Sequence, residues 1–126
     1  MNIIGHGIDI VDVAEMRRWI EDPRDPLIPR CFSPAEVEEI GAGPDRVERL
    51  AGRFAAKEAA LKALGTGWTA DVDWKQIEIT NEPSGQPTIT LNGQAAELAN
   101  AAGAKHFFVS ISHSPHLATA EVIFET

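Results

Sequence analysis

The residues of this sequence whose types and spacing could do chemistry are two carboxylates and a lysine. Glu58 and Lys62 lie four residues apart in an alanine-rich run that reads as a helix, so their side chains share one face. Asp9 lies far upstream in an apolar, strand-like run, where a carboxylate is out of place unless something binds it. Two carboxylates and an ammonium group are what a divalent cation and a phosphate chain would require.

Each candidate residue also has a purely structural interpretation. Glu58 and Lys62 stand in the order that favours a surface ion pair, which is worth only about 0.2–0.5 kcal/mol. Asp9 could be a strand-end residue that hydrogen-bonds a neighbouring turn, and His113 could simply terminate the strand before it. The run 65–67 taken alone is a helix stop followed by a turn, and a weak phosphate loop.

The elements that must position these residues can be read along the chain. A strand is expected over 3–11, where Gly5 and Gly7 allow close backbone approach. Residues 22–29, interrupted by prolines, are expected to form a loop. The other expected elements are a helix capped by Asp12, a short helix begun by the Ser33 capping box, a helix over 45–64, strands over 74–80 and 88–91, a helix over 94–102, and strands over 106–112 and 117–124. This order predicts an α+β fold with helices packed on an antiparallel β-sheet.

Length and composition bound the class of protein. The 126 residues are enough for one domain, 1–126, with a real core. No apolar run approaches membrane-spanning length, and the first residues lack the pattern of a secretory signal. Cys31 is the single cysteine, so it cannot form an internal disulfide, and no spacing pairs it with a zinc ligand. A cytoplasmic protein with no membrane partner is expected.

The charge distribution is more informative than its sum. A net charge of −8 argues against nonspecific binding to nucleic acid. Nine of the eleven basic residues fall between Arg17 and Lys62. Gathered arginines can offer a small site for an anionic ligand, although solvated helix faces would give the same pattern.

Three segments taken together resemble one known family. They are GIDI at 7–10, GRFAAKEA at 52–59 with KALGTG at 62–67, and VSISH at 109–113. Their order and spacing are similar to those of the holo-acyl-carrier-protein synthases, the small phosphopantetheinyl transferases. The resemblance spans essentially the whole sequence, and its central block is highly specific.

The resemblance implies a reaction and its cofactor. The 4′-phosphopantetheine arm of coenzyme A would be transferred to a serine of an apo acyl carrier protein, leaving 3′,5′-ADP and supporting fatty acid biosynthesis. By similarity, Asp9 and Glu58 would hold Mg²⁺ and, with Lys62 against the pyrophosphate, would form the catalytic group. Either Glu58 or a water molecule that it orients would take the proton of the serine; Lys62 would have to be unprotonated to do so, which neighbouring phosphates disfavour.

The resemblance also implies how coenzyme A and the carrier protein are bound. Arg53 and His113 would lie near the nucleotide end of coenzyme A, and Gly65, Thr66 and Gly67 would shape the pocket. The first helix would dock the acidic carrier protein through Arg17 and Arg18, with Met16 as an apolar contact and Arg24 as a weaker candidate. The family forms homotrimers with sites between subunits, so Asp9 and Arg53 need not serve one site from one chain.

Parts of the sequence depart from the family pattern, and other functions stay open. Leu64 stands where members often have an aromatic residue, the segment 92–105 has room for an extra helix, and the prolines of 22–29 put the preference for carrier proteins in doubt. A noncatalytic module that binds coenzyme A or a nucleotide is the alternative function. A purely structural trimer is the third.

Overall fold

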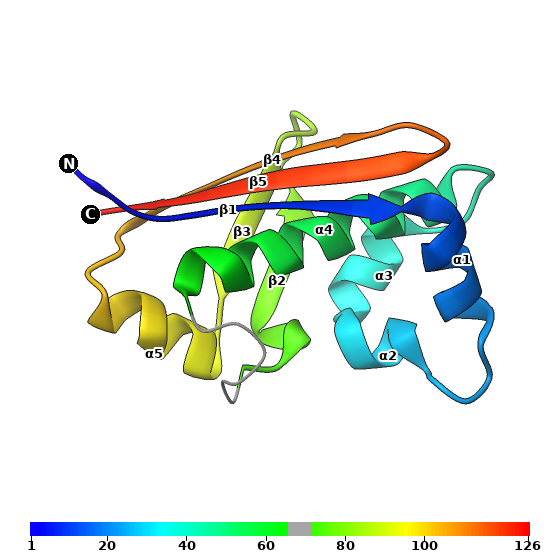
Figure 1. The fold of residues 1–126 in the computed structure, drawn as a ribbon, viewed down its shortest axis with the longest axis horizontal. Helices are drawn as coiled ribbons and strands as arrows, with labels where there is room; N and C mark the ends of the chain where they lie inside the picture. The colour runs from blue at the N-terminus through cyan, green and yellow to red at the C-terminus, as the bar shows by residue number, and fades with distance from the viewer. Residues whose placement is uncertain (66–71) are drawn as a thin grey trace.

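The computed structural model describes residues 1–65 and 72–126, which form two antiparallel sheets and a set of helices (Figure 1). The expected α+β class is confirmed. In chain order the elements are β1 (Ile3–Asp12), α1 (Val13–Glu21), α2 (Leu27–Cys31), α3 (Pro34–Ile40), α4 (Arg46–Leu64), a 3₁₀ helix (Trp74–Gln76), β2 (Ile77–Asn81), β3 (Pro87–Leu91), α5 (Gly93–Ala101), β4 (His106–His113) and β5 (Leu117–Glu125).

The larger sheet has the strand order β1-β5-β4, and α4 packs along its inner face (Figure 1). Gly5 and Gly7 make this packing possible, because a Cβ atom on Gly7 would lie 1.8 Å from the carbonyl oxygen of Ala59, and one on Gly5 would lie 2.3 Å from that of Ala63. The expected close backbone approach at these glycines is therefore confirmed. It brings β1, which carries Asp9, against the helix that carries Glu58 and Lys62.

Helix α4 is the centre of the core. Its small side chains, including Ala55, Ala56, Ala59 and Ala60, are completely buried. The helix ends where the sequence predicts, because Gly65 adopts the left-handed conformation with φ 76° and donates its N–H to the carbonyl of Lys62.

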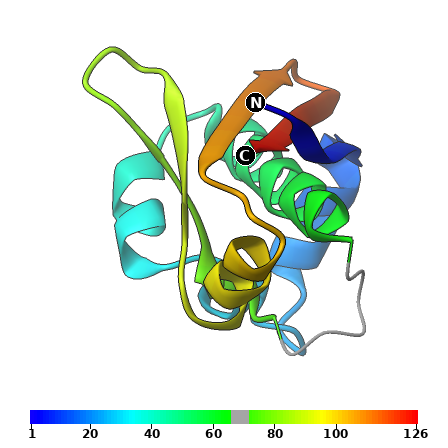
Figure 2. The ribbon, with the colours of Figure 1, turned by 90° about the vertical axis from the view of Figure 1, so that its left-hand side faces the viewer.

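The smaller sheet is the hairpin β2–β3, which Figure 2 shows as an arm beside the larger sheet. Helix α3 packs on β2 and begins with the predicted capping box of Ser33 and Glu36. The strand predicted from residue 74 begins only at Ile77, because Asp73 caps a 3₁₀ turn there by accepting from the N–H of Lys75.

The prediction of a continuous loop over 22–29 is wrong, because Leu27 begins the short helix α2. Pro29 lies in the first turn of this helix, where its missing N–H would have no helical partner in any case. Within the described ranges 1–65 and 72–126, no helix is long and apolar enough to cross a membrane.

Candidate functional site

Asp9 and Lys62 meet across the contact between β1 and α4. Lys62 Nζ lies 3.0 Å from Asp9 Oδ1 and donates to the carbonyl oxygen of Ile8 at 2.8 Å. The Asp9 side chain is mostly buried, whereas Lys62 is about half exposed. Among the described residues, the ion pair of Lys62 is thus with Asp9, and the surface pair with Glu58 that the helical spacing allowed is not formed.

Glu58 completes this group as a half-buried carboxyl on the same helix. Burial and, to a smaller extent, the Asp9 carboxylate raise its pKa to about 7, and Lys62 opposes the shift. A carboxyl with this pKa can take or release a proton near neutral pH. The Asp9 carboxylate disfavours the ionised form of Glu58, a repulsion that a bound cation would relieve.

The described residues include no cluster of three or more His, Cys, Asp or Glu side chains able to enclose a metal ion. This is compatible with Mg²⁺, which is commonly held by one or two carboxylates and completes its coordination with phosphates and water. Asp9 and Glu58 fit that need. A surface pocket of about 300 Å³ opens beside Asp9 and Lys62, and Ile8, Ile10 and Thr119 complete its lining.

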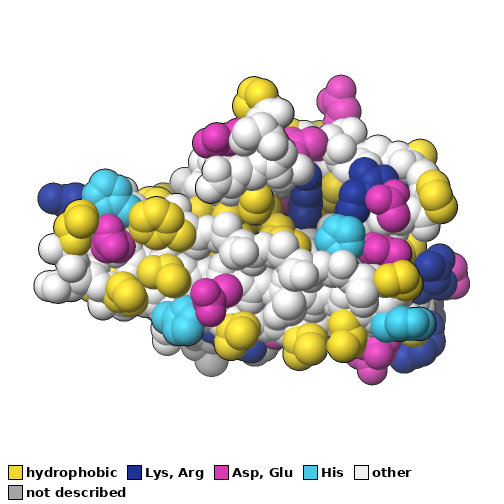
Figure 3. Space-filling view, turned by 90° about the horizontal axis from the view of Figure 1, so that it is seen from above, with side chains coloured by type: hydrophobic (Ala, Val, Ile, Leu, Met, Phe, Trp, Pro, Cys, Tyr) yellow, Lys and Arg dark blue, Asp and Glu magenta, His cyan; other side chains and the backbone are white. Residues whose placement is uncertain are grey.

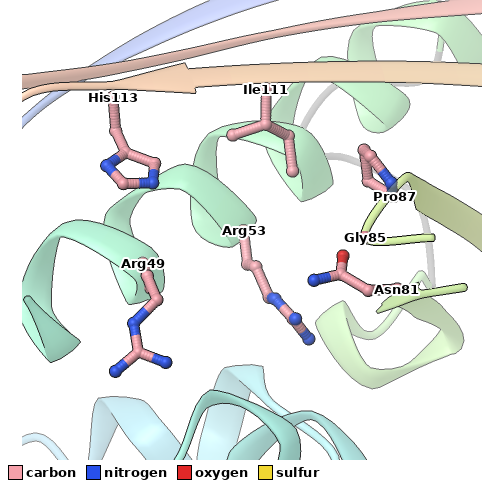
Figure 4. Close-up of a pocket in the computed structure, with 7 residues that line it drawn as sticks. All are labelled: Arg49, Arg53, Asn81, Gly85, Pro87, Ile111 and His113. Carbon is pink, nitrogen blue, oxygen red and sulfur yellow. The ribbon is translucent and has the colours of Figure 1, made fainter. Parts of the chain in front are cut away.

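A second pocket, of about 200 Å³, lies between α4, the hairpin β2–β3 and the end of β4 (Figure 4). Its basic side chains are Arg49, Arg53 and His113. Figure 3, which looks onto the larger sheet from above, shows basic and histidine side chains in a hollow of the surface. Asn81, Gly85, Pro87 and Ile111 complete the lining. Gly52 lets β4 approach α4 at this place, because a Cβ there would lie 2.8 Å from Ile111 Cγ2.

The two predicted residues of this pocket are already held by acidic partners. Arg53 is buried, and it donates through Nη2 to Glu39 Oε1 and through Nη1 to the carbonyl oxygen of Ile79, both at 2.8 Å. His113 Nδ1 lies 3.1 Å from Glu48 Oε2. The pocket therefore combines positive charge with geometry fixed by carboxylates, which suits a phosphate group.

Sequence reasoning did not single out Arg49 as a residue of this pocket. Two of its nitrogens are occupied by the carbonyl oxygens of Ile40 and Ala42 and by Asp45, while its Nε is buried without a hydrogen-bond partner in the part of the chain described. Its position four residues before Arg53, on the same helix face, is the signal that could have found it.

The two pockets share no lining residue, so one chain does not bring all the predicted site residues together. Asp9 and Lys62 line the first pocket, and Arg53 and His113 line the second. Gly65 ends α4 close in sequence to Lys62, whereas the predicted pocket residues Thr66 and Gly67 lie outside the described residues.

The predicted docking residues on and after α1 have different surroundings. Arg17 and Arg18 are exposed, and Arg24 is held by Asp22 at 3.1 Å. The expectation that Met16 offers an apolar contact is wrong for this structure, because its side chain is fully buried against the core. Trp19 is the exposed large apolar side chain of this helix, at 40%.

Comparison with known proteins identifies the class that this fold and these sites define. Residues 5–120 match the sequence profile of the 4′-phosphopantetheinyl transferase superfamily. A holo-[acyl-carrier-protein] synthase of Koribacter versatilis (strain Ellin345) is 42% identical over 123 residues, and one of Geotalea daltonii is 41% identical over the same length; each alignment covers 98% of both chains.

Solved structures agree with this relationship. The holo-[acyl-carrier-protein] synthase of Neisseria meningitidis superposes with a TM-score of 0.87 at 31% identity, covering 99% of this chain and 100% of its own. The Helicobacter pylori synthase in complex with coenzyme A gives 0.82 at 31% identity, covering 95% and 99%. The chain therefore belongs to the 4′-phosphopantetheinyl transferase superfamily and, within it, to the holo-[acyl-carrier-protein] synthases, as its motifs predicted. The prediction of an enzyme is confirmed with it.

Proposed function

We propose that this protein transfers the 4′-phosphopantetheine arm of coenzyme A to a serine of an apo acyl carrier protein, in a Mg²⁺-dependent reaction that releases adenosine 3′,5′-bisphosphate. Residues 1–126 would act as one domain in the cytoplasm, in support of fatty acid biosynthesis. The observation that carries the proposal is the group formed by Asp9, Glu58 and Lys62 where β1 packs along α4.

Each member of this group has a distinct task in the transfer. Asp9 and Glu58 would hold Mg²⁺, which when bound supplies positive charge to the pyrophosphate. Lys62 is half exposed, so its ammonium can turn from Asp9 toward an incoming phosphate and stabilise the charge of the leaving group. Glu58, with a pKa of about 7, is suited to accept the serine proton or to orient a water that does.

The basic pocket of Arg49, Arg53 and His113 is the proposed place for the nucleotide end of coenzyme A. The H. pylori relative was solved with coenzyme A, and a Bacillus anthracis relative was solved in complex with CoA (3′,5′-ADP); the latter is 31% identical with a TM-score of 0.81. These relatives support coenzyme A as the substrate here. Gly65, with Thr66 and Gly67 beyond it, would border the pyrophosphate from the end of α4.

A homotrimer would explain why the two pockets lie apart in one chain. The face of the larger sheet that points away from α4 exposes apolar side chains, and Figure 3 shows hydrophobic groups spread across it. Such a face is typical of a surface covered by another protein. These exposed residues are Ile4, Ile8, Ile10, Phe108 and Leu117. Association through this face would let the first pocket of one subunit and the second pocket of its neighbour form one site.

The acidic carrier protein would dock on α1 through Arg17 and Arg18, with Arg24 in the following loop as a weaker contact. A reversal of charge at Arg17, Arg17→Glu, should raise the KM for the carrier protein far more than the KM for coenzyme A. Equal effects on both constants, or none, would place the docking surface elsewhere.

Intact-mass spectrometry tests the reaction directly. An apo carrier protein incubated with this protein, coenzyme A and Mg²⁺ should gain the mass of one phosphopantetheine group. Glu58→Ala should lower the rate by about 100-fold or more while the protein stays folded, whereas Glu97→Ala, an exposed glutamate on α5, should not change it. Normal turnover by Glu58→Ala would overturn the metal site. Binding of coenzyme A without any mass gain would indicate a noncatalytic binding module.

A further inference from the structure

In the part of the chain that the structure describes, strand β2 pairs with β3 along one edge and with no strand along the other. The backbone groups of that second edge, from Ile77 O to Asn81 N, are nevertheless all hydrogen-bonded. Side chains of α3 and α4 take the place of a neighbouring strand. In order along the edge, Lys57 Nζ donates to Ile77 O, Glu36 Oε2 accepts from Ile79 N at 2.9 Å, Arg53 Nη1 donates to Ile79 O at 2.8 Å, and Glu39 Oε1 accepts from Asn81 N at 2.6 Å. We call this set the side-chain ladder.

The spacing of the two helices makes the ladder regular. Glu36 and Glu39 are three residues apart on α3, and Arg53 and Lys57 are four apart on α4, so each pair lies on one helix face about 5–6 Å apart. Alternate residues of a strand are about 6.5 Å apart, a closely similar step. Each glutamate can therefore bond one N–H of the strand and one cation of α4 at the same time.

The two rungs of the ladder have different surroundings. Glu36 and Lys57 form the inner rung, and both side chains are fully buried. Glu39 and Arg53 form the outer rung, where the exposed fractions are 32% and 8%. Arg53 and Asn81 both line the basic pocket, and Glu39 is the group that bonds both of them.

This arrangement gives Arg53 a restricted position. Its two terminal nitrogens are directed to Glu39 and to the Ile79 carbonyl, so the guanidinium is fixed before any ligand arrives. Figure 4 shows Arg53 extending from α4 toward the hairpin residues of the pocket, with Asn81 close to the end of its side chain. A side chain fixed in this way loses less conformational entropy when a ligand binds.

We propose that Glu39 is a positioning residue of the basic pocket: it holds Arg53 and the Asn81 end of β2 in the geometry that receives the anionic nucleotide end of coenzyme A. The inference rests on the function proposed for that pocket. Glu39 touches neither coenzyme A nor the reacting groups in this scheme, because it acts through Arg53.

Glu39→Gln tests the proposal, since glutamine keeps an oxygen for the N–H of Asn81 and loses the charge that holds Arg53. Titration calorimetry with adenosine 3′,5′-bisphosphate should show a Kd raised about tenfold, and the KM for coenzyme A should rise in parallel. The kcat should stay within about twofold of the wild type, because the reacting groups are untouched. Glu38→Gln, the same change at the exposed neighbouring position, should leave all three constants unchanged.

A double-mutant cycle separates positioning from a general structural role. In an Arg53→Met background, or Arg53→Lys if the methionine variant does not fold, Glu39→Gln should change Kd by less than about twofold, because the group through which Glu39 acts is gone. An equal effect in both backgrounds would overturn the proposal, as would unchanged Kd and KM in Glu39→Gln alone. If the wild type did not bind adenosine 3′,5′-bisphosphate, the function proposed for the pocket would fall and the inference with it.

Discussion

Lys57 gives the sharpest test of how the hairpin β2–β3 is held against the helices. Its ammonium group and the carboxylate of Glu36 are 2.7 Å apart, and both side chains are fully buried. Lys57 Nζ also donates to the carbonyl oxygens of Trp74, at 3.1 Å, and Ile77. Burial lowers the pKa of Lys57, whereas Glu36 opposes that shift. Each buried charge therefore depends on its partner for compensation.

We expect Lys57→Met to lower the free energy of unfolding by about 3–5 kcal/mol, as is typical when one partner of a buried ion pair is removed. Methionine preserves most of the volume, so the loss comes from the uncompensated charge. Among the described residues, the Glu36 carboxylate keeps the N–H groups of Ser33 and Ile79 as donors, and the Ile77 carbonyl loses the donor Lys57. For a domain of this size, the melting temperature should fall by roughly 12–20 °C.

Urea unfolding at one fixed protein concentration measures this loss, since self-association would make the midpoint depend on concentration. Lys75→Met, the same change at an exposed position, should stay within about 0.5 kcal/mol of the wild type. Lys57→Met combined with Glu36→Gln removes both charges and should be more stable than Lys57→Met alone by about 1–3 kcal/mol. A loss below about 1 kcal/mol for the single variant, or no recovery in the double variant, would refute this reasoning.

Three further predictions follow from the packing and electrostatics. Gly7→Ala should destabilise the fold by about 2–3 kcal/mol or more, because the new Cβ would lie 1.8 Å from the Ala59 carbonyl oxygen. An unchanged midpoint of urea unfolding would contradict the close packing of β1 on α4. The pKa of Glu58 is about 7 in the folded chain and 4.5 in the absence of the fold. Between these two values the folded state retains a proton that the unfolded state releases, so the stability of the wild type should fall as the pH rises from 4.5 to about 7. Glu58→Gln, measured without divalent cations, should show a flatter pH profile, and parallel profiles would count against the raised pKa. Light scattering of the wild type should give the mass of the proposed trimer. Ile10→Glu, at a position 64% exposed on the outer sheet face, should lower that mass while Glu97→Gln does not, and an unchanged mass would move the interface elsewhere.

Local sequence signals predicted most of the elements because their causes are local. The capping box at Ser33, the left-handed stop at Gly65 and the close approach at Gly7 each depend on the chemistry of one or a few residues. The errors have local causes as well. The prolines of 22–29 predict a loop, although Pro29 lies in a first helical turn, and Asp73 caps a 3₁₀ turn where the sequence predicts the start of a strand.

The candidate site was predicted less completely, because its residues are joined across elements. The four-residue spacing predicted an ion pair between Glu58 and Lys62. In the structure β1 packs against α4, and Lys62 forms its ion pair with Asp9 instead. Met16 has the spacing of a helix face, and spacing cannot say whether that face meets the core or a partner; here it meets the core. The roles of Asp9, Glu58 and Lys62 in catalysis remain predictions.

By itself, the sequence determined the family, the α+β class and the charged residues proposed for the site, because motifs and periodicity are properties of the chain. Only the tertiary structure decided which of these charges meet. It placed Asp9 beside Lys62 and separated their pocket from the pocket of Arg53 and His113. It also paired Arg53 with Glu39 and with the Ile79 carbonyl at the edge of β2. The physical reason is that an ion pair depends on the distance between two side chains, and residues far apart in the chain acquire that distance only when the sheet and the helices pack together.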